Sequence, residues 1–135
     1  HQQLKDYAQS RGINGLTFTD MVSEGQLRWL YENAKAYIFP SLSEGFGLPG
    51  LEAMVHGLPV IAADATCLPE IYRAGALYFD PRSADDLAAK IGQLLVDPQL
   101  ASDLRVKGAA VAASYSWQKM AEQTLQVYDT VLNMK

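Results

Sequence analysis

Apolar residues occur along this chain as short unbroken runs separated by segments of helical periodicity. The unbroken runs cover residues 36–39, 59–63 and 76–79. Short, continuously apolar strands that alternate with helices are typical of a parallel sheet covered on both faces. We therefore predict an α/β fold.

The first third of the chain adds three further elements. Residues 1–10 are typical of the end of a helix, and residues 16–19 follow two glycines as a predicted short strand. A helix is predicted from about Ser23, because apolar residues then recur at helical spacing. These residues are Leu27, Leu30, Tyr31 and Ala34. We expect this stripe, and Trp29 beside it, to pack against the core.

The last third of the chain is predicted to be helical. Ser83 and Asp86 form a start similar to a capping box, and Asp97 followed by proline opens the next helix. Ser116 can cap a final helix over residues 117–134. One face of that helix is apolar and carries Trp117, Ala121, Leu125, Tyr128 and Leu132.

The composition restricts the class of function. The chain has 135 residues, a hydrophobic fraction of 49% and a formal net charge of −4, which predicts one globular domain without a basic surface. Nucleic-acid binding is therefore not expected. The only cysteine, Cys67, fits a reducing compartment and a small core residue. No apolar run approaches the roughly 20 residues that span a bilayer, so we expect any membrane contact to be peripheral.

Residues 41–52 contain the candidate chemistry, because they lie between the carboxyl end of a predicted strand and the start of a helix. Ligands bind at this position in open α/β sheets. Gly45 and Gly47 allow the backbone to approach a ligand, and Pro49 suits a first helical turn whose amides attract an anion. These features describe a phosphate-binding loop.

Two carboxylates, Glu44 and Glu52, lie eight positions apart in the same segment. Carboxylates repel phosphates but accept hydrogen bonds from hydroxyls, so we expect a ligand that combines a phosphate with a polyol, such as a nucleotide sugar. Two simpler interpretations stay open. Glu52 near a helix N-terminus would complement the helix dipole, worth about 0.3–1 kcal/mol, and Glu44 would be solvated.

A second class of function matches part of the same segment. Residues 45–50 fit the dinucleotide-binding spacing of glycines, and Glu70 lies about 20 residues further on as a ribose acid. In that fingerprint the first glycine closes a tight turn at the end of the strand. Here residues 40–44 intervene, so the dinucleotide-binding oxidoreductase is the alternative.

Residues 39–60, with the sequence FPSLSEGFGLPGLEAMVHGLPV, resemble the signature of the retaining family-4 glycosyltransferases. The resemblance continues through residues 63–64, 68–70, 80–81 and 115–117. It implies the GT-B fold of two facing Rossmann-like domains, of which residues 1–135 are a partial, N-terminally truncated C-terminal donor-binding domain. It also implies metal-independent transfer without a cofactor, retention of anomeric configuration, and a final helix that packs toward the preceding domain.

The resemblance also implies roles for individual residues. Glu44 corresponds to the catalytic glutamate beside the donor sugar, where it stabilises charge near the anomeric carbon, and Glu52 corresponds to the residue that binds the ribose. The backbone amides that meet the sugar and the diphosphate belong to Gly45, Phe46, Gly47 and Leu48. Family members use an arginine and a lysine near the start of the domain for the diphosphate, and no segment of this chain matches theirs. Thr66 is expected either to reach the donor or to serve local turn chemistry.

Residues 65–70 and 76–81 are similar to those of bacterial mannosyltransferases of surface-polysaccharide assembly, which makes GDP-mannose the first expected donor and a UDP-sugar the second. The resemblance implies hexose transfer to a saccharide or lipid-linked acceptor, in the cytoplasm or at the inner face of the membrane. A third class is a non-catalytic interaction module with the GT-B fold.

Strand order leads to a further expectation for the sheet. In the usual order 3-2-1-4-5-6, the strand at residues 36–39 is the fourth and that at residues 16–19 is the third, and the two strands between them are missing. We therefore expect an unpaired sheet edge, and either a homodimer through that edge or a third strand that docks outside its usual position. In both cases we expect no transfer by this chain alone.

Overall fold

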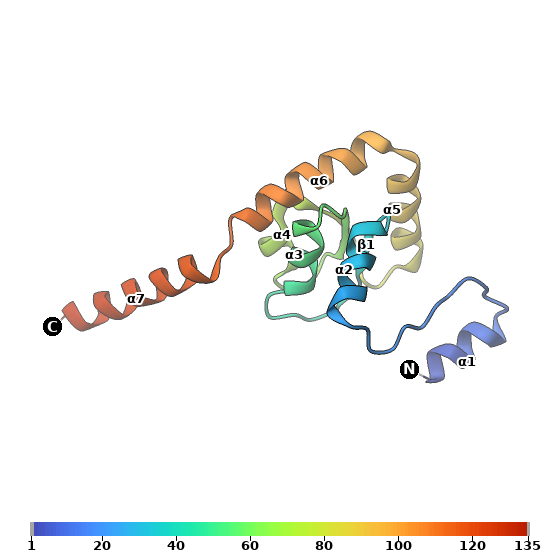
Figure 1. Ribbon diagram of the computed structural model, residues 1–135, viewed down its shortest axis with the longest axis horizontal. Coiled ribbons are helices and arrows are strands. Elements are labelled where there is room, and N and C mark those ends of the chain that lie inside the picture. Colours follow the sequence, from blue (N-terminus) through green and yellow to red (C-terminus); the bar gives the residue numbers. More distant parts are fainter. Residues whose placement is uncertain (1, 135) are drawn as a thin grey trace.

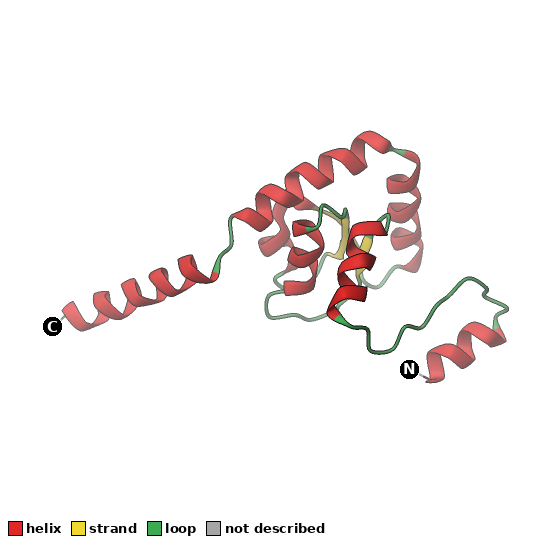
Figure 2. Ribbon diagram, in the orientation of Figure 1, coloured by secondary structure: helices red, strands yellow, loops and turns green. Residues whose placement is uncertain are grey.

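The computed structural model describes residues 2–134 as a small parallel sheet surrounded by helices (Figures 1 and 2). The elements follow in the order α1 (Gln2–Ser10), α2 (Glu24–Asn33), β1 (Tyr37–Phe39), α3 (Leu48–Val55), β2 (Val60–Ala63), α4 (Leu68–Tyr72), the 3₁₀ turn η1 (Arg73–Gly75), β3 (Ala76–Phe79), α5 (Ala84–Val96), α6 (Pro98–Ala113) and α7 (Trp117–Asn133).

The three strands form one parallel sheet in the order β1-β2-β3. Val60 at the start of β2 is in register with Tyr37 of β1 on one side and with Ala76 of β3 on the other. All four residues of β2 are buried, as expected for a central strand with helices on both faces. The predicted α/β class is therefore confirmed, and so is the consecutive order of these three strands.

The hydrophobic core lies between the sheet and helices α3, α4 and α6, which contact one another. Its largest fully buried side chains include Tyr72 and Met54. The predicted caps are present: the side chains of Ser83, Asp97 and Ser116 each accept a hydrogen bond from the first turn of the helix that follows.

The strand predicted at residues 16–19 is wrong. This segment belongs to an irregular connection between α1 and α2, and Leu16 is 58% exposed. A strand needs a neighbouring strand to satisfy its backbone groups, and the sheet within residues 2–134 consists of β1, β2 and β3. Beyond β1, within residues 2–134, the sheet has no further strand, so one edge of β1 is unpaired as expected.

The core packing predicted for the apolar stripe of α2 and for Trp29 is also wrong. Of the apolar stripe on α2, only Tyr31 is buried, and Trp29 is 60% exposed. The final helix α7 buries none of its residues, and Figure 1 shows it extending away from the body of the molecule on the side opposite α1. The apolar face predicted on α7 is present but has no partner within the described residues.

Candidate functional site

The loop between β1 and α3 is held in place by Tyr72 of α4. Its hydroxyl donates a hydrogen bond to the carbonyl of Gly47, the residue that precedes α3 and has a left-handed φ of 87°. A Cβ on Gly50 would lie 2.9 Å from Cε2 of Tyr72 and still closer to its hydroxyl. Gly47 and Gly50 are therefore required by packing against Tyr72. Among these three glycines of the segment, Gly45 alone faces open space, because a Cβ there would meet no atom within 4 Å.

Glu44 is half-buried in this loop, and both of its backbone polar groups have side-chain partners. Its N–H donates to Oγ1 of Thr66 over 3.2 Å, and its carbonyl accepts a hydrogen bond from the Cys67 thiol over 3.3 Å. Sequence reasoning singled out Thr66 but missed Cys67, which it interpreted as a core residue. Thr66 contacts the glutamate loop itself, and its reach to a donor stays a prediction.

Glu52 lies in the second turn of α3, because the helix begins at Leu48 and its first turn contains no acidic residue. The helix-dipole interpretation of Glu52 therefore loses its basis, because the effect of the dipole falls off beyond the first turn. Oε2 of Glu52 accepts a hydrogen bond from the Tyr31 hydroxyl over 3.3 Å. The carboxylate is otherwise exposed.

The pKa values of two tyrosines, Tyr31 on α2 and Tyr37 on β1, are raised by burial and by the charges of nearby glutamates. Burial raises the pKa of Tyr31 to about 12, with smaller effects from Tyr37 and Glu52. Burial also raises the pKa of Tyr37, and the negative charges of Glu52 and Glu44 raise it further. The charges of both glutamates therefore act on Tyr37, the first residue of β1.

His56 is the C-cap residue of α3, and Gly57 follows it at a left-handed φ of 69°. Its ring stacks on Tyr31 at a centroid distance of 5.5 Å, and its Nδ1 lies 3.7 Å from Oε1 of Glu32. These contacts anchor the end of α3 to α2.

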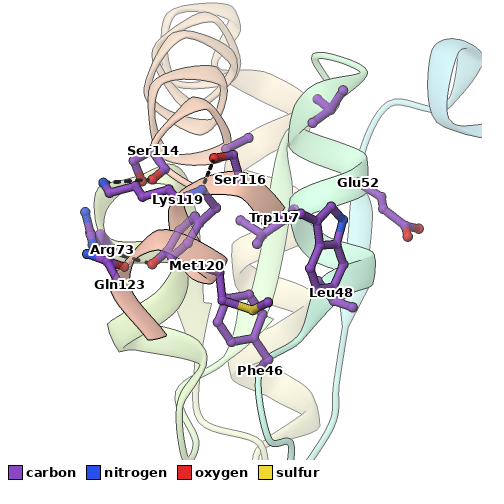
Figure 3. Close-up of a pocket in the computed structure, with 14 residues that line it drawn as sticks. Phe46, Leu48, Glu52, Arg73, Ser114, Ser116, Trp117, Lys119, Met120 and Gln123 are labelled. Carbon is purple, nitrogen blue, oxygen red and sulfur yellow. Dashed lines mark hydrogen bonds between the residues drawn. The ribbon is translucent and has the colours of Figure 1, made fainter. Parts of the chain in front are cut away.

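A groove of about 590 Å³ runs between α3 and the start of α7 (Figure 3). Phe46 and Leu48 line one wall, and Trp117 and Met120 of α7 line the other. Figure 3 shows Phe46 facing Met120, whereas Glu52 lies at the edge of the groove with its carboxylate directed away from Met120. The groove itself is therefore apolar at its centre.

Two cationic side chains also line the groove. The guanidinium of Arg73 lies over the ring of Tyr115 at 5.6 Å, and the ammonium of Lys119 lies 3.4 Å from the carbonyl of Ser114. The ring of Tyr115 meets Phe46 edge-on at a centroid distance of 5.5 Å. Neither cation belongs to a local motif, so the sequence alone does not mark them as part of a site.

Glu70, the acid of the dinucleotide alternative, lies in the first turn of α4, where it is exposed. That position follows β2, whereas Glu52 follows β1. The two acids belong to different helices, so a bound nucleotide would distinguish the two interpretations.

The chain belongs to the glycosyl transferases group 1 family, whose model matches residues 1–111. The O-antigen chain mannosyltransferase B of Escherichia coli is 36% identical over 113 residues, which cover 84% of this chain and 30% of that protein. The resemblance described from residues 39–60 is therefore confirmed at the level of the family.

Solved structures place the fold among GT-B glycosyltransferases. Sucrose-phosphate synthase from Thermosynechococcus elongatus matches with a TM-score of 0.85 and 28% identity, over 99% of this chain and 35% of that one. Anabaena HepE, solved in complex with UDP and glucose, matches with a TM-score of 0.84 and 22% identity, over 96% of this chain and 36% of that one. The chain spans about a third of the length of each of these three proteins.

No helix among residues 2–134 combines the length and the apolar character that a membrane crossing requires.

Proposed function

We propose that this chain is the donor-binding part of a glycosyltransferase that transfers a hexose from a nucleotide sugar. The observation that carries the proposal is the pair of glutamates on the segment that follows β1. Glu44 lies in the loop before α3, and Glu52 is exposed on α3 with its carboxylate bonded to Tyr31. A carboxylate so placed can accept hydrogen bonds from two neighbouring hydroxyls of a ribose. The amides at the start of α3 suit the adjoining phosphates.

Glu44 is proposed as the catalytic residue beside the donor sugar. It lies in the loop at the carboxyl end of β1, where its backbone is held by Thr66 and Cys67. A fixed negative charge at that point stabilises positive charge that develops at the anomeric carbon. The proposed reaction retains the anomeric configuration and uses neither a metal ion nor a cofactor.

The proposed donor-binding set is otherwise made of backbone. The groups are the loop amides of Gly45, Phe46, Gly47 and Leu48, with Thr66 at the neighbouring loop. Gly45 suits a close approach of the sugar, because nothing occupies the space in front of its Cα.

GDP-mannose is the proposed first donor, since the Escherichia coli relative is named a mannosyltransferase. A UDP-sugar is the second, because HepE was solved with UDP. The acceptor is proposed to be a saccharide or a lipid-linked saccharide. A cytoplasmic protein working at the inner face of the membrane fits this reaction, and the free thiol of Cys67 fits a reducing compartment.

We propose that a preceding domain of the same protein covers the apolar face of α7 and supplies the acceptor site. Trp117, Leu125 and Leu132 on this helix are 73%, 60% and 69% exposed, an exposure that a partner surface would remove. For the 135-residue chain on its own, the unpaired edge of β1 favours a homodimer instead. Sedimentation of that chain as a monomer at all concentrations would contradict the dimer.

The test of the function is a transfer assay on the complete protein with GDP-mannose, UDP-glucose and a saccharide acceptor. We expect release of nucleoside diphosphate that depends on the acceptor and persists in excess EDTA. Absence of turnover with every nucleotide sugar would contradict the proposal. Activity lost in EDTA would contradict its metal independence alone.

A further inference from the structure

Glu44 lies in a segment with no regular structure, so other elements must fix its position. Residues 40–47 form neither helix nor strand, and the bond from Oγ of Ser41 to the carbonyl of Ser43 stays within the segment. The two contacts that reach the backbone of Glu44 from another element both come from the connection between β2 and α4. They are the hydroxyl of Thr66 and the thiol of Cys67.

These two contacts act on opposite sides of the same Cα. Thr66 accepts from the N–H of Glu44 over 3.2 Å, and Cys67 donates to its carbonyl over 3.3 Å. If only one of these contacts were present, the backbone of Glu44 could still rotate about the axis that joins Ser43 and Gly45. Both contacts together fix the peptide planes on either side, and therefore the direction in which the Glu44 side chain leaves the backbone.

Thr66 makes its contact from an unfavourable backbone conformation. Its φ is +46°, in the left-handed region where a β-branched residue is a clear outlier. Such strain persists where the surrounding structure enforces it, and it is concentrated at functional sites. Glycine would adopt this conformation without strain, but glycine has no hydroxyl for Glu44.

We propose that Thr66 and Cys67 are positioning residues that hold the catalytic glutamate in place for transfer. This inference rests on the proposed function of Glu44. It assigns to Thr66 a role in turnover through Glu44, in place of a direct contact with the donor. Since a displacement of about 1 Å at a reacting group can cost about a hundredfold in rate, loss of either contact should lower kcat.

The experiment compares three substitutions of Thr66 in the complete protein. Thr66→Val keeps the branched shape and the strain but removes the hydroxyl, Thr66→Gly removes both the hydroxyl and the strain, and Thr66→Ser keeps the hydroxyl. Each variant is characterised by kcat, by KM for the nucleotide sugar and by Tm. Thr130→Val is the matched control, because Thr130 is an exposed threonine whose hydroxyl bonds a backbone carbonyl on α7.

We expect kcat to fall at least about tenfold in Thr66→Val and Thr66→Gly, with donor KM changed less than about threefold. Thr66→Ser should recover most of the lost turnover. The Tm of Thr66→Gly should equal or exceed that of the wild type, so that activity and stability change in opposite directions. Cys67→Ala should lower kcat in the same way, and Cys67→Ser should recover it.

Three results would overturn the inference. If KM rises while kcat is kept, Thr66 contacts the donor directly. If kcat follows Tm across all variants, its role is structural only. If both glycine and valine keep full turnover, the contact with Glu44 has no role. A wild-type protein without any transfer activity would refute the proposed function instead, and the thermal measurements would still report on the strain at Thr66.

Discussion

The hydroxyl of Tyr31 on α2 lies 3.3 Å from Oε2 of Glu52 on α3, which joins two helices that flank β1 in the sequence. The ring of Tyr31 is buried against Tyr37 and His56, so its hydroxyl has little freedom to move. An exposed glutamate on a helix would otherwise sample several rotamers. This contact selects one of them and leaves the other carboxylate oxygen available to a ligand.

Replacement of Tyr31 by phenylalanine should weaken nucleoside diphosphate binding by about fivefold, because one hydrogen bond contributes about 1 kcal/mol. Isothermal titration calorimetry on the complete protein measures the change. Tyr37→Phe is the matched control, since the Tyr37 ring packs against Tyr31 while its hydroxyl makes no hydrogen bond with the described residues. If wild type and Tyr31→Phe bind the nucleoside diphosphate with equal affinity, Tyr31 has no role in nucleotide binding.

Replacement of Glu44 by glutamine should lower kcat by on the order of a hundredfold and leave donor affinity nearly unchanged. The reason is that its proposed work is to stabilise charge that develops only in the transition state. Steady-state kinetics with a varied nucleotide sugar separate the two quantities. An unchanged kcat with a raised KM would make Glu44 a binding residue.

Replacement of Gly50 by alanine should lower the free energy of unfolding by about 1–3 kcal/mol, the usual cost of overpacking a core. The added methyl group would overlap the buried ring of Tyr72, which has no space to withdraw. Gly45→Ala is the control and should change stability by less than about 0.5 kcal/mol, because its methyl group meets open space. Urea denaturation followed by circular dichroism compares the two. Similar losses of unfolding free energy in both variants would show that contact with Tyr72 does not require glycine at position 50.

Alkaline pH should destabilise the fold through its buried tyrosines. Burial raises the pKa of Tyr31 to about 12, and burial with the charge of Asp64 raises that of Tyr78 to about 12. The folded state therefore favours the neutral phenols, whose ordinary pKa is about 10. This contribution is complete below pH 10 and is lost as the pH rises through 12. The urea midpoint should fall across that range, and it should fall less in Tyr31→Phe combined with Tyr78→Phe. A midpoint independent of pH would contradict the assignment.

Much of the fold could be predicted from local pattern. The apolar runs predicted β1, β2 and β3, and the caps at Ser83, Asp97 and Ser116 marked the helix starts. The segment 16–19 was predicted wrongly, because its composition suits a strand but strand formation depends on a neighbour. The exposure of Trp29 was missed for a similar reason, since periodicity shows that a face is apolar but not what covers it.

The candidate site could be predicted in part. The motif identified Glu44, Glu52 and the glycines, because they lie within one short segment. Tyr31 and Tyr72 could not be found in the same way, since their partners are 21 and 25 positions away along the chain. Contacts of this kind depend on how helices pack, and a single sequence contains no local sign of them.

The central claim is that Glu52 binds the ribose of a nucleotide sugar whose sugar lies beside Glu44. A crystal structure of the complete protein with GDP-mannose or its nucleoside diphosphate tests it most directly, supported by calorimetry on Glu52→Gln. We predict ribose hydroxyls on Glu52, phosphates at the start of α3, and a loss of about tenfold to over a hundredfold in affinity in the variant. A nucleotide whose ribose lies at Glu70, together with unchanged affinity in Glu52→Gln, would contradict the account.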